Sequence, residues 1–207
     1  MQVFLIRHPR PLIAAGICYG QLDVDCEDPR PIARRLLPLL PGDTRIIASP
    51  LRRTRHLAEA LHPEPLFDAR LMEINFGDWE GRQWADIDRK LIDAWAADVL
   101  HFVPPGGESV AMLQARAIAC VDKFKEFGEE RIALVTHGGV IRALLGHWAQ
   151  LPVEEWSQLK LAFGSVTRVN IDVAGSKAQF QVLEVVNDFA SPARVAPIPY
   201  DEPKPIF

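Results

Sequence analysis

The sequence is poor in cysteine, and the cysteines that it has form no recognised pattern. Cys18, Cys26 and Cys120 are an odd number without CxxC spacing, which argues against a disulfide framework and against a thiolate zinc site. We therefore expect all of the thiols to stay reduced.

Long apolar runs and targeting signals are absent as well. No apolar run approaches the roughly 18 residues that are needed to cross a bilayer. Residues 1–6 show neither a basic leader nor the long apolar stretch of a signal peptide. The sequence predicts a cytoplasmic protein without a membrane partner.

The chain has no excess of basic charge. Its formal net charge is −4 at pH 7, which provides no basic surface for nucleic acid. Arginine is nevertheless frequent near the motifs described below, at Arg7, Arg52, Arg53 and Arg142. Guanidinium groups at these positions indicate local binding of a small anion.

No Gly/Ser-rich linker, charge run or internal repeat divides the chain. With 48% hydrophobic and 24% charged residues, it has the composition of a globular protein that buries a substantial core. We expect residues 1–207 to form a single domain. The sequence leaves the oligomeric state open.

Alternating strand-like and helix-like segments predict an α/β fold, a three-layer αβα sandwich with a central, mainly parallel sheet. Ser49 and Pro50 are predicted to cap and begin the second helix. Near the C-terminus, turn residues 174–176 between two segments of period-two alternation indicate a β-hairpin, and the proline-rich end indicates a surface tail. The predicted strands are 3–7, 44–48, 66–68, 132–135, 166–173 and 179–186, and the predicted helices are 31–40, 51–61, 87–97, 110–127 and 140–148.

Two histidines follow closely on predicted strands. His8 comes after the apolar run 3–6 and Arg7, and His137 comes after the run 132–135 and Thr136. Ligands of open α/β sheets bind at the carboxyl ends of the strands, so both imidazoles are candidates for chemistry. Taken alone, a histidine at a strand end is more often structural. A catalytic role for His8 and His137 therefore depends on which residues accompany them.

The neighbours supply what phosphoryl transfer through a covalent intermediate requires. Neutral His8 can attack phosphorus with one ring nitrogen while the other donates a hydrogen bond that fixes the tautomer. Glu73 is the predicted proton donor, because a carboxyl group beside bound phosphate charge keeps its proton more readily. The predicted phosphate-binding donors are Arg7, Arg53, His137 and Gly138, the last at the start of a helix. This chemistry needs no metal and no organic cofactor.

Four motifs, in order along the chain, resemble those of the histidine phosphatase superfamily, also called phosphoglycerate-mutase-like. They are Arg7-His8, residues 49–54 (SPLRRT), residues 73–81 (EINFGDWEG) and residues 136–139 (THGG). Four motifs in sequence order are far more specific than any one of them. The resemblance implies that His8 is phosphorylated, that Glu73 acts as the acid and then as the base for water, and that the phosphoryl group of a small substrate is bound by Arg7, Arg53 and His137.

The loop after His8 departs from the family pattern. Pro9-Arg10-Pro11 replaces the usual Gly, acidic residue and Ser or Thr, and Ala14 stands where the family has Asn. The family's extra phosphate contacts from this loop are therefore not carried over. With the following Gly16-x-Cys18-Tyr19-Gly20-x-x-Asp23, the loop resembles a bacterial subgroup associated with α-ribazole phosphatase.

The predicted substrate-pocket residues are Tyr19, Trp79, Glu108 and Ser165. Simple packing is an equal alternative for the two aromatic residues, and steadying a helix start is the alternative for Glu108. Two other functions also stay open: a phosphoglycerate-type mutase, and a phospholigand-binding protein without turnover. The chain is shorter than the cofactor-dependent mutases of the resembled family, which carry extra cap segments, and this favours hydrolysis. The intact set of predicted catalytic residues, with both nucleophile and acid, favours an enzyme.

Overall fold

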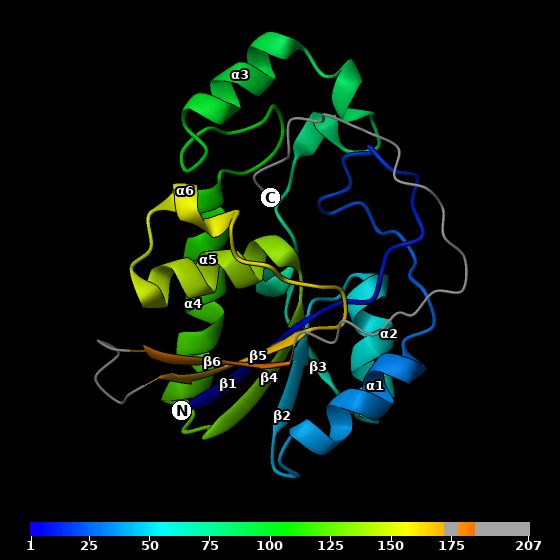
Figure 1. The fold of residues 1–207 in the computed structure, drawn as a ribbon, viewed down its shortest axis with the longest axis vertical. Helices are drawn as coiled ribbons and strands as arrows, with labels where there is room; N and C mark the ends of the chain where they lie inside the picture. Colours follow the sequence, from blue (N-terminus) through cyan, green and yellow to red (C-terminus); the bar gives the residue numbers. More distant parts are fainter. Residues whose placement is uncertain (172–177, 185–207) are drawn as a thin grey trace.

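The computed structural model describes residues 1–171 and, by backbone alone, residues 178–184. Six strands form one sheet in the order β3-β2-β4-β1-β5-β6 (Figure 1). The strands are β1 (Gln2–Arg7), β2 (Arg45–Ala48), β3 (Leu66–Phe67), β4 (Arg131–Thr136), β5 (Val166–Ile171) and β6 (Ala178–Glu184). Strands β1, β2, β3 and β4 run parallel to one another. At one edge of the sheet, β5 runs antiparallel to both of its neighbours, β1 and β6. The predicted mainly parallel sheet is confirmed.

Helices cover both faces of the sheet, which confirms the three-layer prediction. Figure 1 shows α1 and α2 on one side, α4 and α5 on the other, and α3 beyond the end of the strands. The helices are α1 (Arg30–Leu36), α2 (Arg52–Leu61), α3 (Arg89–Ala97), α4 (Val110–Glu126), α5 (Gly138–Ala149) and α6 (Val153–Trp156), with short 3-10 turns at Leu37–Leu39, Ala69–Leu71, Gly77–Trp79 and Trp84–Asp86.

Side chains of the central strands pack alternately into two separate hydrophobic cores, one on each face of the sheet. In β1, Val3 and Leu5 join the core beneath α4 and α5, whereas Phe4 and Ile6 join the core beneath α1 and α2. Because successive residues of a strand point to opposite faces, a continuous apolar run is what a strand covered on both sides requires. The unbroken apolar runs in β1 and β4 therefore fix both strands at the centre of the sheet.

Several predicted helix boundaries differ from the structure, and two of the differences have a clear physical cause. The helix expected over 31–40 ends at Leu36 and continues as a 3-10 turn, since Pro38 has no amide hydrogen to donate to the preceding turn. The expected cap at Ser49 is also absent. Leu51 precedes the first residue of α2, and no side chain of the described residues caps the helix. The Ser49 hydroxyl is used elsewhere, as described below.

The C-terminal hairpin is confirmed as a pair of antiparallel strands, β5 and β6. Its predicted turn, at residues 174–176, and the predicted surface tail lie outside the described residues. Within the described part of the chain, no helix is both long and apolar enough to cross a membrane.

We predict that Gly146→Ala destabilises the protein. An added Cβ would lie 2.1–2.4 Å from ring atoms of Trp156, so α5 and α6 would have to separate. Overpacking of this kind costs about 1 to 3 kcal/mol, more than the roughly 1 kcal/mol that alanine gains over glycine within a helix. Urea denaturation should show the loss. Gly42→Ala is the matched control, because nothing lies within 4 Å of its added Cβ, and equal stabilities of the two variants would contradict the packing argument.

Candidate active site

The parallel pairing of β1 with β4 brings the two motif histidines together. Arg7 lies opposite Thr136 in the register of the two strands, so the next residues, His8 and His137, leave the sheet at the same edge. Their ring centroids lie 5.1 Å apart, and the residues are 1% and 0% exposed. The strand ends thus place two imidazoles side by side in a buried position.

The hydrogen bonds of His8 fix its tautomer. Its Nδ1 lies 2.6 Å from the carbonyl oxygen of Pro9, and a carbonyl only accepts, so Nδ1 carries the proton. Burial, together with the charges of Arg53 and Arg7, lowers the pKa of His8 well below its ordinary value of 6.5. The ring is therefore neutral at physiological pH, with a lone pair on Nε2, the state that a nucleophile needs.

Arg7 and Arg53 place two guanidinium groups at this edge. The terminal nitrogens of Arg53 donate to the carbonyls of Gly20 and Leu22, at 2.6 and 2.9 Å. Arg7 donates to the carbonyl of Leu161 and lies over the ring of Phe163, 4.0 Å from its centroid. These contacts fix both side chains. Burial lowers the pKa of each guanidinium.

A serine hydroxyl lies against one ring nitrogen of His137. Ser49 Oγ lies 2.8 Å from Nε2 of His137 and also accepts from the amide of Leu51, at 3.4 Å. Burial and the charge of Arg53 lower the pKa of His137 well below 6.5, so the ring is neutral and carries one proton. When the Ser49 hydroxyl donates to Nε2, that proton is on Nδ1.

Three buried nitrogens at this edge have no hydrogen-bond partner among the described residues. They are Nε of Arg7, Nε of Arg53 and Nδ1 of His137. An unsatisfied buried donor costs about 1 to 3 kcal/mol, so three from residues that surround one imidazole are unexpected in a purely structural cluster. Donors arranged in this way match the oxygens of a phosphoryl group.

The Glu73 carboxylate lies at the N-terminus of α5. One of its oxygens accepts from the amide of Gly139, at 3.1 Å, and the other from the amide of Ile74, at 3.0 Å. A Cβ added to Gly139 would lie 2.3 Å from the carboxylate, which explains the second glycine of the motif. The carboxylate also acts electrostatically on Arg7 and Arg53. The structure thus brings Glu73 to the predicted phosphate-binding residues.

Gly138 and Tyr19 also lie at this edge. A Cβ on Gly138 would be 3.1 Å from the Arg142 guanidinium and 3.4 Å from that of Arg7, so the glycine admits both cations. The guanidinium of Arg53 lies 5.5 Å from the centroid of the half-buried Tyr19 ring. Burial raises the pKa of the Tyr19 phenol, which therefore stays neutral.

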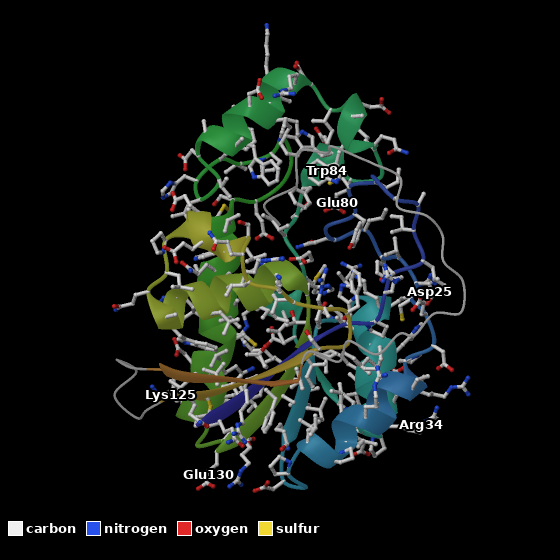
Figure 2. The ribbon with its side chains drawn as sticks, in the orientation of Figure 1. Asp25, Arg34, Glu80, Trp84, Lys125 and Glu130 are labelled. Carbon is white, nitrogen blue, oxygen red and sulfur yellow. The ribbon has the colours of Figure 1, made fainter. Side chains whose placement is uncertain are left out.

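The structure places the other predicted pocket residues differently. Trp79 is 1% exposed and packs in an aromatic cluster with Phe76, Trp84, Trp95 and Phe102. This is the packing alternative, and the indole makes no contact with the phosphate-binding residues in the described structure. Figure 2 shows Glu80 and Trp84 beyond the carboxyl ends of the strands, away from Glu130 at the start of β4.

Glu108 and Ser165 act on the backbone and on a neighbouring side chain. The Glu108 carboxylate pairs with Arg116, at 2.6 Å, and accepts from the amide of Asn75. Ser165 is buried, and its carbonyl accepts from the amide of Arg7. These contacts involve Arg116, the backbone of Asn75 and the backbone of Arg7, and not the phosphate-binding side chains.

Sequence reasoning missed three contributors: Ser49 beside His137, Phe163 beneath Arg7, and Arg116 behind Glu73. Ser49 was interpreted as a helix cap, a role for which serine is equally suited. The other two become neighbours of the site only through folding, and no spacing rule links them to it. Arg142, which the sequence already indicated as a candidate for anion binding, lies beside Gly138.

One cluster away from the histidines has donor atoms that are close enough to hold a metal ion. These atoms belong to Asp25, Cys26 and His56 and lie within 4.8 Å of one another; Asp25 is labelled beside α2 in Figure 2. Asp25 already pairs with His56 and with the guanidinium of Arg52. That guanidinium opposes a cation, and the cluster contributes no group to the arrangement around His8.

Comparison with known proteins identifies the family. Residues 3–184 match the histidine phosphatase superfamily (branch 1). The chain belongs to the histidine phosphatase superfamily.

Individual members of this superfamily resemble the chain along most of its length. It is 31% identical over 181 residues to the glucosyl-3-phosphoglycerate phosphatase of Mycolicibacterium vanbaalenii, covering 76% of this chain and 78% of the relative. It is 26% identical to the adenosylcobalamin/alpha-ribazole phosphatase of Escherichia coli K12, covering 92% and 97%. A mycobacterial glucosyl-3-phosphoglycerate phosphatase solved with VO3 superposes with a TM-score of 0.74 at 28% identity, covering 87% and 97%. This histidine phosphatase is a phosphoric monoester hydrolase, and the predicted phosphoglycerate-mutase-like fold is confirmed.

We predict that Ser49→Ala lowers kcat/KM about 5-fold, the equivalent of one hydrogen bond of about 1 kcal/mol. The variant loses the hydroxyl that donates to Nε2 of His137. The ring proton is then no longer held on Nδ1, where it would bind a phosphoryl oxygen. Steady-state kinetics on an aryl phosphate would measure the change. Ser157→Ala, at an exposed serine, is the matched control. Unchanged kinetics in Ser49→Ala would show that the tautomer of His137 has no influence on the rate.

We also predict that stability falls with acidification below pH 6.5. His8 and His137 have folded pKa values well below 6.5, so the unfolded chain binds more protons than the folded chain in that range. From about pH 7.5 to about pH 5.5 each histidine should remove roughly 1 kcal/mol from the free energy of unfolding. Urea titrations at both values would measure the fall, which should be smaller by about that amount in His137→Gln. An equal fall in both proteins would contradict a neutral, buried His137.

Proposed function

We propose that this chain hydrolyses a small phosphomonoester in two steps through a phosphohistidine on His8. The observation that carries the proposal is the pairing of a neutral imidazole, whose Nδ1 is held by Pro9, with three partnerless donors around it. The arrangement fits an attacking nitrogen next to a cradle for phosphoryl oxygens.

In the first step, Nε2 of His8 forms a bond to phosphorus and the bond from phosphorus to the leaving oxygen breaks. Glu73 gives its proton to that oxygen, so an alcohol departs rather than an alkoxide. Nε of Arg7, Nε of Arg53 and Nδ1 of His137 donate to the phosphoryl oxygens as charge develops on them. The free amides at the start of α5, Gly138 among them, favour the same negative charge.

In the second step, a water molecule attacks the phosphohistidine. Glu73, now a carboxylate, takes a proton from the water as its oxygen bonds to phosphorus and the bond from Nε2 to phosphorus breaks. Inorganic phosphate leaves, and His8 and Glu73 return to their starting states. The guanidinium groups neutralise the charge that Mg²⁺ neutralises in many other phosphoryl-transfer enzymes, and the neutral His137 adds a hydrogen bond.

The leaving group is proposed by similarity. The alpha-ribazole phosphatase relative aligns over nearly the whole chain, and residues 7–23 resemble the subgroup associated with that activity. We propose α-ribazole 5′-phosphate as the first substrate to test and glucosyl-3-phosphoglycerate, the substrate class in the name of the other relative, as the second. Tyr19, at the edge of the site, is the proposed contact for the leaving group.

The proposal predicts that aryl phosphate hydrolysis persists in excess chelator and is lost in His8→Ala. The expected loss is at least about 10⁴-fold, because the covalent route disappears. His101→Ala, at an exposed histidine paired with Asp98, should behave like the wild type. Acid-labile ³²P label should be trapped on the wild type and not on His8→Ala. Activity retained in His8→Ala would overturn the nucleophile assignment, and loss of activity on chelation would overturn the metal-free mechanism.

A further inference from the structure

The segment that carries Glu73 is irregular. Between the 3-10 turns Ala69–Leu71 and Gly77–Trp79, residues 72–76 belong to no helix or strand. Backbone hydrogen bonds of regular structure therefore do not fix the position of the carboxyl group. A proton donor must be held within hydrogen-bonding reach of the leaving oxygen, so some other group has to hold this segment.

One guanidinium, from Arg116 on α4, binds three carbonyls in this segment and in the turn that precedes it. Its Nη1 donates to the carbonyls of Arg70 and Met72, at 2.7 and 2.6 Å, and its Nη2 donates to the carbonyl of Glu73, at 2.9 Å. Long helices such as α4, which spans 17 residues, provide a rigid base for such a contact. Arg116 thereby ties the backbone of Glu73 to the helix layer formed by α4 and α5.

Glu108 completes the arrangement from the start of α4. Its two carboxylate oxygens accept from Nε and Nη2 of Arg116, at 3.0 and 2.6 Å, and one of them also accepts from the amide of Asn75. The amide of Glu108 donates in turn to the carbonyl of Asn75. The Arg116 and Glu108 side chains are only 19% and 12% exposed, so this forked pair is partly shielded from solvent.

We propose that Arg116 and Glu108 form a positioning pair for general acid–base catalysis: together they hold the backbone on both sides of Glu73, so that its carboxyl group meets the leaving oxygen. Neither side chain touches substrate. The inference rests on the proposed acid role of Glu73 and extends it to two residues to which no step has been assigned.

The amide of Gly139 also binds the Glu73 carboxylate, at 3.1 Å, and the amide of Phe76 donates to the Glu80 carboxylate, at 3.0 Å. Neither of these contacts holds the carbonyls that Arg116 binds. Gln21 donates one neutral hydrogen bond to the carbonyl of Glu73, at 3.0 Å, and Thr136 donates one to the carbonyl of Leu71. Without the guanidinium, the carbonyls of Arg70 and Met72 lose the donor described here. We expect the segment to keep its general path and to lose the exact placement of the carboxyl group.

The leaving group separates this role from a merely structural one. A nitrophenolate departs without a proton, whereas an alkoxide needs one from Glu73. We would measure kcat/KM, which reports the steps through release of the leaving group, for 4-nitrophenyl phosphate and for a simple alkyl phosphate. In Arg116→Lys, which keeps the charge and loses the fork, the alkyl phosphate should lose about 10 to 100-fold and the aryl phosphate less than about 3-fold.

Further variants keep the test decisive. Glu108→Gln should show the same selective loss, and it serves if Arg116→Lys proves unstable in urea denaturation. Arg131→Lys is the matched control, because Arg131 pairs with Asp43 at the opposite end of β4. Glu73→Gln should show the largest loss with the alkyl phosphate.

The outcomes distinguish the two proposals. Selective loss in Glu73→Gln, but equal loss of both substrates or no loss in the Arg116 and Glu108 variants, would overturn the positioning pair alone. Equal loss of both substrates in Glu73→Gln would overturn the acid role itself and the positioning pair with it. Selective loss in all three variants would support both.

Discussion

The parallel pairing of β1 with β4 is the constraint on which the rest of the site depends. With Arg7 opposite Thr136, both strands end at the same level, and the next residue of each is a histidine. A shift of one residue in this register would turn every side chain of one strand to the other face. The two apolar cores prevent that shift, because Val3 and Leu5 fit one core while Phe4 and Ile6 fit the other. Packing far from the chemistry thus sets the spacing of the two imidazoles.

Burial gives these groups their chemical states. Arg7 and Arg53 are held by carbonyls rather than by carboxylates, so their positive charge is left to act on its surroundings. It acts with burial to keep His8 and His137 neutral, which makes one a lone-pair donor and the other a hydrogen-bond donor. The same arrangement leaves buried nitrogens of Arg7, Arg53 and His137 without a partner among the described residues. This lowers the stability of the fold, and a binding site for an anion explains why the cost is tolerated.

The groups around His8 differ in how they are supported. His8 and His137 extend from strands, and Arg53 lies in the first turn of α2, so regular structure fixes them. Glu73 lies in an irregular segment and is held instead by Arg116, Gln21 and the amide of Gly139. A proton donor on such a segment depends on tertiary hydrogen bonds for its placement, whereas the nucleophile depends on the sheet.

The amino-acid sequence was enough to predict the layers of the fold, because unbroken apolar runs require strands that are covered on both faces. It was also enough to identify His8, Arg7, Arg53, Glu73 and His137 as candidates, because their motifs occur in a fixed order. It could not place Trp79, since an indole is equally suited to a core and to a pocket, and the aromatic cluster decided for the core. Nor could it reveal Ser49 beside His137 or Arg116 behind Glu73, residues separated by 88 and 43 positions along the chain. Such contacts form only when strands and helices pack against one another. The local pattern of residues along the chain does not predict which distant side chains will then lie in contact.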